Sequence, residues 1–241
     1  MKSIFSFLLL VLAVSCASGP TKEEKEAFTN KVDQEKLKTV KELAASSDSR
    51  IPLKAGQWVK IHTTLKEGNK DQSLSTFKVL KVDGKTVTME VETTNASTLG
   101  LNVMQYEVEN YPTHNKLDIS KQELEKLVDK MNIKKITMKQ GNEPAQELPV
   151  TYMPMAKGML KDLFASGYRI GEPKKTACAS EYLKAPTCVV FEYEANAFGF
   201  TTKGTSFAHS SVPVVGFIKS DSDKSETKVV NFGLTGAKSS L

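Results

Sequence analysis

The sequence predicts an α+β fold in which a curled antiparallel β-sheet, or half-barrel, is covered by two or three helices. Apolar and polar residues alternate in about nine or ten segments after residue 53. These segments follow one another in hairpin order, without the strand–helix–strand rhythm of a parallel sheet. A sheet with one apolar face needs a cover, and curling around helices supplies it.

The clearest strand signals lie in the first half of this region. Residues 58–65 alternate, beginning with Trp58, and so do residues 73–82 and 86–92. Asp83-Gly84 stands between the last two runs. An Asp-Gly pair between alternating segments is the strongest short-range hairpin signal, so we expect a hairpin here.

The same alternation predicts which side chains of the second hairpin strand face the core. Val87, Met89 and Val91 fall on one face and are expected to be buried. Glu90 and Glu92 fall on the other face and are expected to face water.

A first helix is predicted over residues 22–45. Thr21 and Glu24 have the spacing of a capping box, and Phe28 and Val32 follow at helical spacing. The helix either packs on the main domain or acts as a stalk. Packing is favoured, because a pure tether would not need apolar residues.

Two further helical segments are predicted among the strands. Ser120 and Glu123 form a second capping box, and residues 154–165 form a short amphipathic stretch. After the capping box, apolar residues recur at i, i+3, i+4 and i+7: Leu124, Leu127, Val128 and Met131.

The N-terminus has the pattern of a secretory signal. Met1-Lys2-Ser3 is a basic start, residues 4–14 are apolar, and the small residue Ser15 precedes Cys16. The run 4–14 has about half of the roughly 20 apolar residues that a membrane-spanning helix needs. An ordinary signal peptide with an incidental Cys16 is the other alternative, and it would leave an odd cysteine in an exported protein.

Residues Ala13-Val14-Ser15-Cys16 resemble a bacterial lipobox. The resemblance implies cleavage before Cys16, acylation with chains such as palmitate, and anchoring to a membrane through those chains. Alanine stands where leucine is usual, which is more similar to spirochaetal than to enteric lipoproteins. Ala17 is not acidic, which favours the outer membrane, on its periplasmic face or at the cell surface.

These observations divide the chain into three parts. Residues 1–15 are the signal peptide, residues 16–50 are a lipidated N-terminus with a helix or linker, and residues 51–241 are a single β-rich domain.

The remaining two cysteines, Cys178 and Cys188, are predicted to form a structural disulfide. Export places them in an oxidising space, and the pair is the one left if Cys16 is acylated. Their spacing is unlike the Cys-x-x-Cys of redox enzymes, and no histidine lies between them to help bind a metal.

Charge and motifs predict neither a nucleic-acid partner nor catalysis. Without residues 1–15 the chain has 32 basic and 28 acidic residues, a small excess that is spread widely. The histidines His62, His114 and His209 are far apart, so neither a metal site nor a cofactor is predicted. Gly204 to Ala208 imitates a nucleophile elbow around Ser206, with His209 close by in the sequence, but it lacks the second glycine and opens no helix, so we do not expect an enzyme.

Apolar residues are the remaining candidates for a binding site. Most are expected to be core residues, and the alternative is a cavity for an acyl chain or another hydrophobic ligand. For that alternative the candidate ligand-binding residues are Met155, Met159, Phe191 and Tyr193.

Three stretches together carry a family resemblance: residues 55–59 (Ala-Gly-Gln-Trp-Val), residues 178–193, and residues 212–219 with 232–239. They resemble exported proteins of unassigned function from diderm bacteria. Those proteins open with a Gly-x-Trp-Val strand and close with a Gly-x-x-Gly-Ala-Lys-Ser tail. Their sheet is similar to the half-barrel of the Lol lipoprotein carriers, which encloses acyl chains.

Three hypotheses about function follow. The first is a lipid-anchored, non-catalytic binding or structural module of the cell envelope. The second, which the family resemblance implies, is a carrier of a lipid or other hydrophobic ligand in a half-barrel cavity. The third and least supported is a hydrolase.

Overall fold

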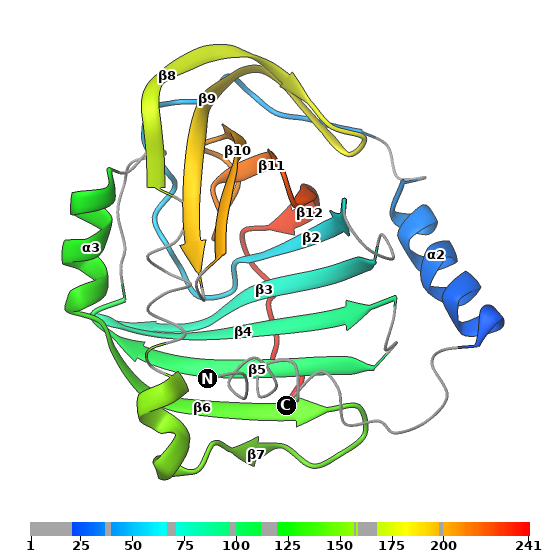
Figure 1. Ribbon diagram of the computed structural model, residues 1–241, viewed down its shortest axis with the longest axis vertical. Coiled ribbons are helices and arrows are strands. Elements are labelled where there is room, and N and C mark those ends of the chain that lie inside the picture. Colours follow the sequence, from blue (N-terminus) through cyan, green and yellow to red (C-terminus); the bar gives the residue numbers. More distant parts are fainter. Residues whose placement is uncertain are drawn as a thin grey trace.

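A single twelve-stranded sheet dominates the structure, a computed structural model (Figure 1). The structure describes residues 21–36, 40–66, 71–96, 100–111, 120–156, 158, 168–197 and 200–241. Along the sheet the strands follow the order β1-β9-β10-β11-β12-β2-β3-β4-β5-β6-β7, and β8 pairs with β9. The strands are β1 (Lys41–Glu42), β2 (Trp58–Leu65), β3 (Gln72–Asp83), β4 (Thr86–Asn95), β5 (Leu101–Glu109), β6 (Asn132–Gln140), β7 (Gln146–Glu147), β8 (Tyr168–Ala179), β9 (Leu183–Ala197), β10 (Phe200–Ala208), β11 (Phe217–Ser222) and β12 (Ser225–Gly233).

The sheet is curled and its ladders are antiparallel, apart from the short parallel pair β1–β9. In Figure 1 the strands β3–β6 run across the view and β8–β10 run up it. Among the described residues no ladder joins β7 to the opposite end of the sheet, so the sheet is not closed. The predicted curl and antiparallel order are confirmed.

The predicted α+β class is confirmed only in part, because the described chain is mostly β and its helices are few. Its helices are α2 (Lys22–Lys36), α3 (Lys121–Asp129) and the 3₁₀ turn η1 (Val150–Tyr152), after which residues 153–156 and 158 are α-helical. The helix predicted over residues 154–165 is thus present at its start, and most of it lies outside the described residues. The first predicted helix was to reach residue 45, but Lys41 and Leu43 instead donate backbone hydrogen bonds to Tyr182 and Lys184. Pairing with β9 thus replaces the helix in this segment.

The predicted hairpin and the second capping box are both present. Asp83 and Thr86 are paired at the end of the β3–β4 ladder, and Gly84 has the positive φ (57°) that this turn requires. Ser120 and Glu123 cap α3 reciprocally. Leu124 and Val128 of this helix pack into one buried cluster with Met89.

The expectation that Glu90 faces water is wrong. Met89 is 1% exposed as predicted, but Glu90, on the opposite face of β4, is 0% exposed. The alternation of apolar and polar residues correctly separates the two faces of the strand, but it does not show that both faces are covered by other parts of the chain. The cover is the C-terminal segment, residues 234–241, which crosses the strands β2–β5 in Figure 1.

Helix α2 packs on the sheet and is not a free stalk. Its Phe28 and Val32 are buried in the same cluster as Leu74 of β3. Burial of these two side chains, rather than helix propensity, stabilises a helix of 15 residues.

Candidate functional site

The predicted site residues do not converge on one place in the structure. Cys16 and Met159 lie outside the described residues, and Met155 is half-buried. Phe191 is buried in a small cluster with Val189 and Ala208, and Tyr193 packs against it. The described contacts do not bring Met155 to this cluster.

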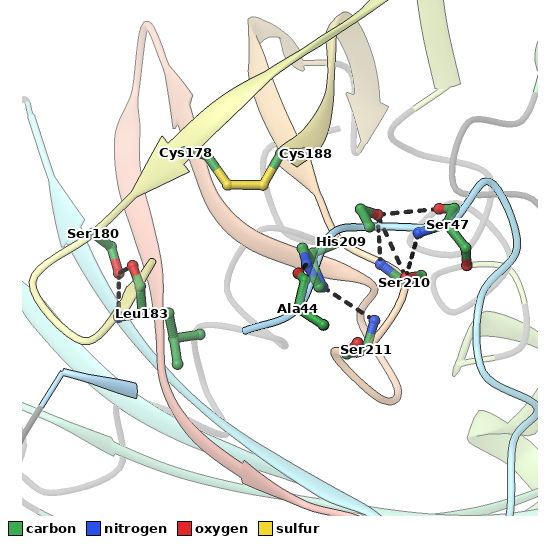
Figure 2. Close-up of a disulfide and its surroundings, with 10 residues drawn as sticks. Ala44, Ser47, Cys178, Ser180, Leu183, Cys188, His209, Ser210 and Ser211 are labelled. Carbon is green, nitrogen blue, oxygen red and sulfur yellow. Dashed lines mark hydrogen bonds between the residues drawn. A yellow bond between two sulfur atoms is a disulfide. The ribbon is translucent and has the colours of Figure 1, made fainter. Parts of the chain in front are cut away.

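The pair Cys178 and Cys188 forms the predicted disulfide (Figure 2). Their Cα atoms are 5.9 Å apart, and both residues are buried. The bond links β8 to β9 where the register of their ladder shifts, between Thr176 and Cys178. It therefore holds the hairpin together at one of the two irregular points of its ladder.

His209, close to this disulfide in Figure 2, attaches the N-terminal part of the chain to the sheet. Its Nδ1 accepts a hydrogen bond from the backbone N–H of Ser211 (3.1 Å), so the proton is on Nε2. Nε2 lies 3.0 Å from the carbonyl oxygen of Ala44, to which it donates. Burial lowers the pKa of His209, and the bond to Ala44 opposes that shift, so the ring is neutral at pH 7.

Serine side chains extend this attachment from Ala44 to Ser46 and Ser47. The backbone N–H of Ser47 donates to Ser210 Oγ (2.9 Å), and the backbone N–H of Ser210 donates to Ser46 Oγ (3.1 Å). Figure 2 shows these bonds beside His209. Residues 44–47 are thus held at the end of β10.

Arg50 continues the same connection to the loop between β10 and β11. Its guanidinium donates to the carbonyl oxygen of Val214, a residue with a positive φ of 64°. A Cβ on Gly216 would lie 2.7 Å from Arg50 Nε, so only glycine allows this approach. Burial lowers the pKa of Arg50, and burial raises the pKa of the nearby Tyr111 to about 12.

Sequence reasoning missed this attachment of residues 40–51. Val212-Pro213 to Gly216 was recognised as part of a family motif, but its partner, Arg50, is more than 160 residues away in the sequence. A buried histidine followed by serines carries no local signal of the segment it binds.

A second feature joins the first and last parts of the family motif. Ala237 N–H donates to the carbonyl oxygen of Gly56 (2.9 Å), and Trp58 Nε1 donates to that of Thr235 (3.2 Å). Trp58 is paired with Gly233, where a Cβ would lie 2.3 Å from the indole nitrogen. The glycine therefore makes room for the tryptophan ring.

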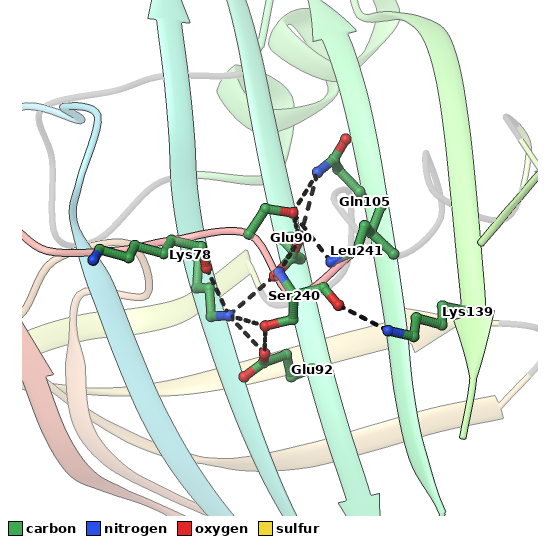
Figure 3. Close-up of polar contacts among 9 residues, drawn as sticks. Lys78, Glu90, Glu92, Gln105, Lys139, Ser240 and Leu241 are labelled. Carbon is green, nitrogen blue, oxygen red and sulfur yellow. Dashed lines mark hydrogen bonds and ion pairs between the residues drawn. The ribbon is translucent and has the colours of Figure 1, made fainter. Parts of the chain in front are cut away.

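Beyond this junction the C-terminal segment covers a charged cluster (Figure 3). Lys78 Nζ lies 3.0 Å from Glu90 Oε1 and 2.6 Å from Glu92 Oε1. Glu90 also accepts from Ser239 Oγ (2.7 Å) and from the backbone N–H of Ser240 (3.0 Å). The buried carboxylate is thus paired and hydrogen-bonded, as a buried charge requires.

A groove of about 500 Å³ lies beside this cluster. We call it the lysine groove. Its walls are α2, the face of the sheet that carries Glu90, and the C-terminal segment. Apolar residues Trp58, Leu74 and Leu101 line it together with Lys31, Lys60, Lys78 and Lys238. Sequence analysis did not identify it, because the lining comes from three distant parts of the chain.

A second hollow, of about 420 Å³, lies beside the disulfide. Its lining is mostly small and apolar, with Leu43, Ala177 and Pro186 among the residues. Glu42 and Lys184 stand at its edge as an ion pair (2.8 Å).

Three chemical features can be stated for the described part of the chain. Both ring nitrogens of His209 bind backbone groups, so the ring does not act as a base for Ser206. The described residues contain no group of three or more metal-ligating side chains. None of the described helices has the length and apolar character needed to cross a bilayer.

Comparison with known proteins yields weak likenesses. No protein-family model matches the sequence, and no curated protein matches it. A crystal structure described as a "putative lipoprotein" from Parabacteroides distasonis has a TM-score of 0.33 at 11% identity, covering 78% of this chain and 99% of that one. A structure of PNGF-II has a TM-score of 0.25 at 9% identity, covering 76% of this chain and 28% of that one. At these values neither likeness bears on the fold or function of this chain.

Proposed function

We propose that the protein is a lipoprotein of the cell envelope, anchored in the outer membrane through acylated Cys16, with a non-catalytic binding or structural domain. The position of α2 is the observation that carries the proposal furthest. The helix begins six residues after Cys16 and packs on the sheet through Phe28 and Val32.

This position limits how far the domain lies from its anchor. At roughly 3.6 Å per residue, the Cα atoms of Cys16 and Thr21 are at most about 18 Å apart. From Thr21 onward the chain is attached to the domain by α2, β1, His209 and Arg50. An acylated Cys16 would therefore hold the domain close to the lipid surface. More than one acyl chain would make that anchoring stable.

The non-catalytic character has support in the neighbourhood of the imitation nucleophile elbow. Ser206 is buried in a strand, and His209 uses both ring nitrogens for the backbone. Of these two candidates for a hydrolytic pair, His209 therefore serves the attachment of residues 44–47 and Ser206 is buried.

Labelling with radioactive palmitate tests the anchor. We expect the wild-type chain to incorporate label and to enter the detergent phase on phase partition, whereas Cys16→Ser does neither. Ser18→Ala, two residues further on, is the matched control and should behave like the wild type. An unlabelled, water-soluble wild-type protein would overturn the proposal.

A carrier of a lipid or other hydrophobic ligand is the second candidate. The curled, unclosed sheet and the apolar hollow of about 420 Å³ beside the disulfide support it. Native mass spectrometry of the purified protein separates the candidates. An acyl species bound without covalent attachment supports the carrier, and a mass without ligand supports the module.

A further inference from the structure

The lysine groove has the size and construction of a small-molecule site. Its volume of about 500 Å³ falls within the range typical of ligand pockets. Helix α2, strands β2–β5 and the C-terminal segment all contribute to it. Since α2 and the C-terminal segment are each fixed to the sheet, the groove is formed before any ligand arrives.

The apolar part of the groove is fixed in position. Of the two leucines in its lining, Leu74 is buried and Leu101 is exposed to solvent. The Trp58 ring is held by its hydrogen bond to Thr235 and by the close approach that Gly233 permits. A rigid aromatic ring beside two leucines offers apolar contact at little cost in conformational entropy.

The charge of the groove is positive. Lys78 is neutralised by Glu90 and Glu92, and Glu92 is the one acidic residue among those that line the groove in the described chain. Lys31 and Lys238 are exposed, and no described residue forms an ion pair with either ammonium group. They place two positive charges beside the apolar surface.

We propose that the lysine groove binds an anion that carries an apolar portion. The anionic group lies against the ammonium groups of Lys31 and Lys238, which suit phosphate as point charges. The apolar portion lies against Trp58 and the leucines. An anionic phospholipid and a soluble organic phosphate share this chemistry. The inference goes beyond the proposed function and does not depend on acylation, because the groove is built from residues after position 30.

Trp58 reports on the groove directly, because it is the single tryptophan of the chain. The test uses the full chain with Cys16→Ser, so that no acyl chain is present. The probes are dihexanoyl phosphatidylglycerol and dihexanoyl phosphatidylcholine, each below its micelle concentration, and hexyl phosphate, a soluble organic phosphate with an apolar chain. We expect the phosphatidylglycerol to change Trp58 emission saturably and to bind about tenfold more tightly than the phosphatidylcholine.

Lysine variants test the location of the site. Lys238→Ala and Lys31→Ala should each weaken binding by about fivefold, as expected for an exposed charge contact. Lys85→Ala is the matched control, because it removes the same charge from the β3–β4 turn, outside the groove. Its affinity should equal that of the parent. All three lysines are exposed, so the variants should keep the parent's melting temperature.

The three probes also separate the sources of the ligand. Hexyl phosphate that binds as tightly as the phosphatidylglycerol supports a soluble organic phosphate, and much weaker binding of hexyl phosphate supports a lipid. Equal affinities for the two short-chain lipids would overturn the proposal. So would an absence of binding both by Trp58 emission and by equilibrium dialysis, or a Lys238→Ala affinity equal to that of Lys85→Ala.

Discussion

Replacing Lys78 by methionine tests the charged cluster under the C-terminal segment. Lys78 Nζ contacts two carboxylates, the Lys238 carbonyl oxygen (3.0 Å) and Ser240 Oγ (2.8 Å). Methionine is close in length but leaves Glu90 without its cation in a site that is 0% exposed. Removing one partner of a buried ion pair costs about 3–5 kcal/mol. We expect a loss near the lower end, about 3 kcal/mol, because Ser239 and Ser240 still donate to the carboxylate.

The assay is the free energy of unfolding in urea with the disulfide intact. Lys81→Met is the matched control on the same strand, because its ion pair with Asp83 is exposed and should be worth at most about 1 kcal/mol. A double variant, Lys78→Met with Glu90→Leu, removes the unpaired charge and should lose less stability than Lys78→Met alone.

Two results would refute this reasoning. One is a Lys78→Met variant that unfolds within about 0.5 kcal/mol of the wild type, as an ordinary surface substitution does. The other is a double variant whose loss equals the sum of the two single losses, since independent sites add.

Three further predictions concern the attachment of the N-terminal part and the β8–β9 hairpin. The pKa of His209 is lowered in the folded state, so the contribution of this ring to folding stability is complete above the unfolded pKa of about 6.5 and is lost as the pH falls. Between pH 7.5 and 5.5 the stability of the wild type should therefore drop more than that of His209→Gln, by up to about 1.4 kcal/mol per pH unit. Parallel curves of stability against pH for the two proteins would contradict this. Replacing Cys178 and Cys188 by serine should cost roughly 3 kcal/mol, and alkylation of the native protein without reductant should find neither thiol free. Phe28→Ala should accelerate amide hydrogen exchange throughout α2 while β4 stays protected, whereas unchanged exchange in α2 would show that Phe28 does not hold it.

Local signals in the sequence predicted local structure well. The Asp83-Gly84 turn and the Ser120–Glu123 capping box depend on residues at most three positions apart, so the pattern contains the whole interaction. The helix predicted over residues 22–45 is wrong in its last part for the opposite reason. The conformation of residues 41–42 depends on pairing with β9, which lies about 140 residues later in the sequence.

The candidate sites were less predictable, because long-range contacts build them. Glu90 looks like a water-facing residue until the C-terminal segment, about 150 residues away, covers it. The family motif offered a partial signal, since its Gly-x-Trp and Gly-x-x-Gly elements prove to be neighbours. The lysine groove follows from that junction, which sequence reasoning did not anticipate, and from the packing of α2, which it favoured.

The intact mass of protein extracted from membranes tests the central claim most directly. The account predicts a chain that begins at Cys16 and carries the added mass of its acyl chains, located on the N-terminal peptide after digestion. A chain that retains Met1, or one that begins near residue 16 without added mass, would contradict it.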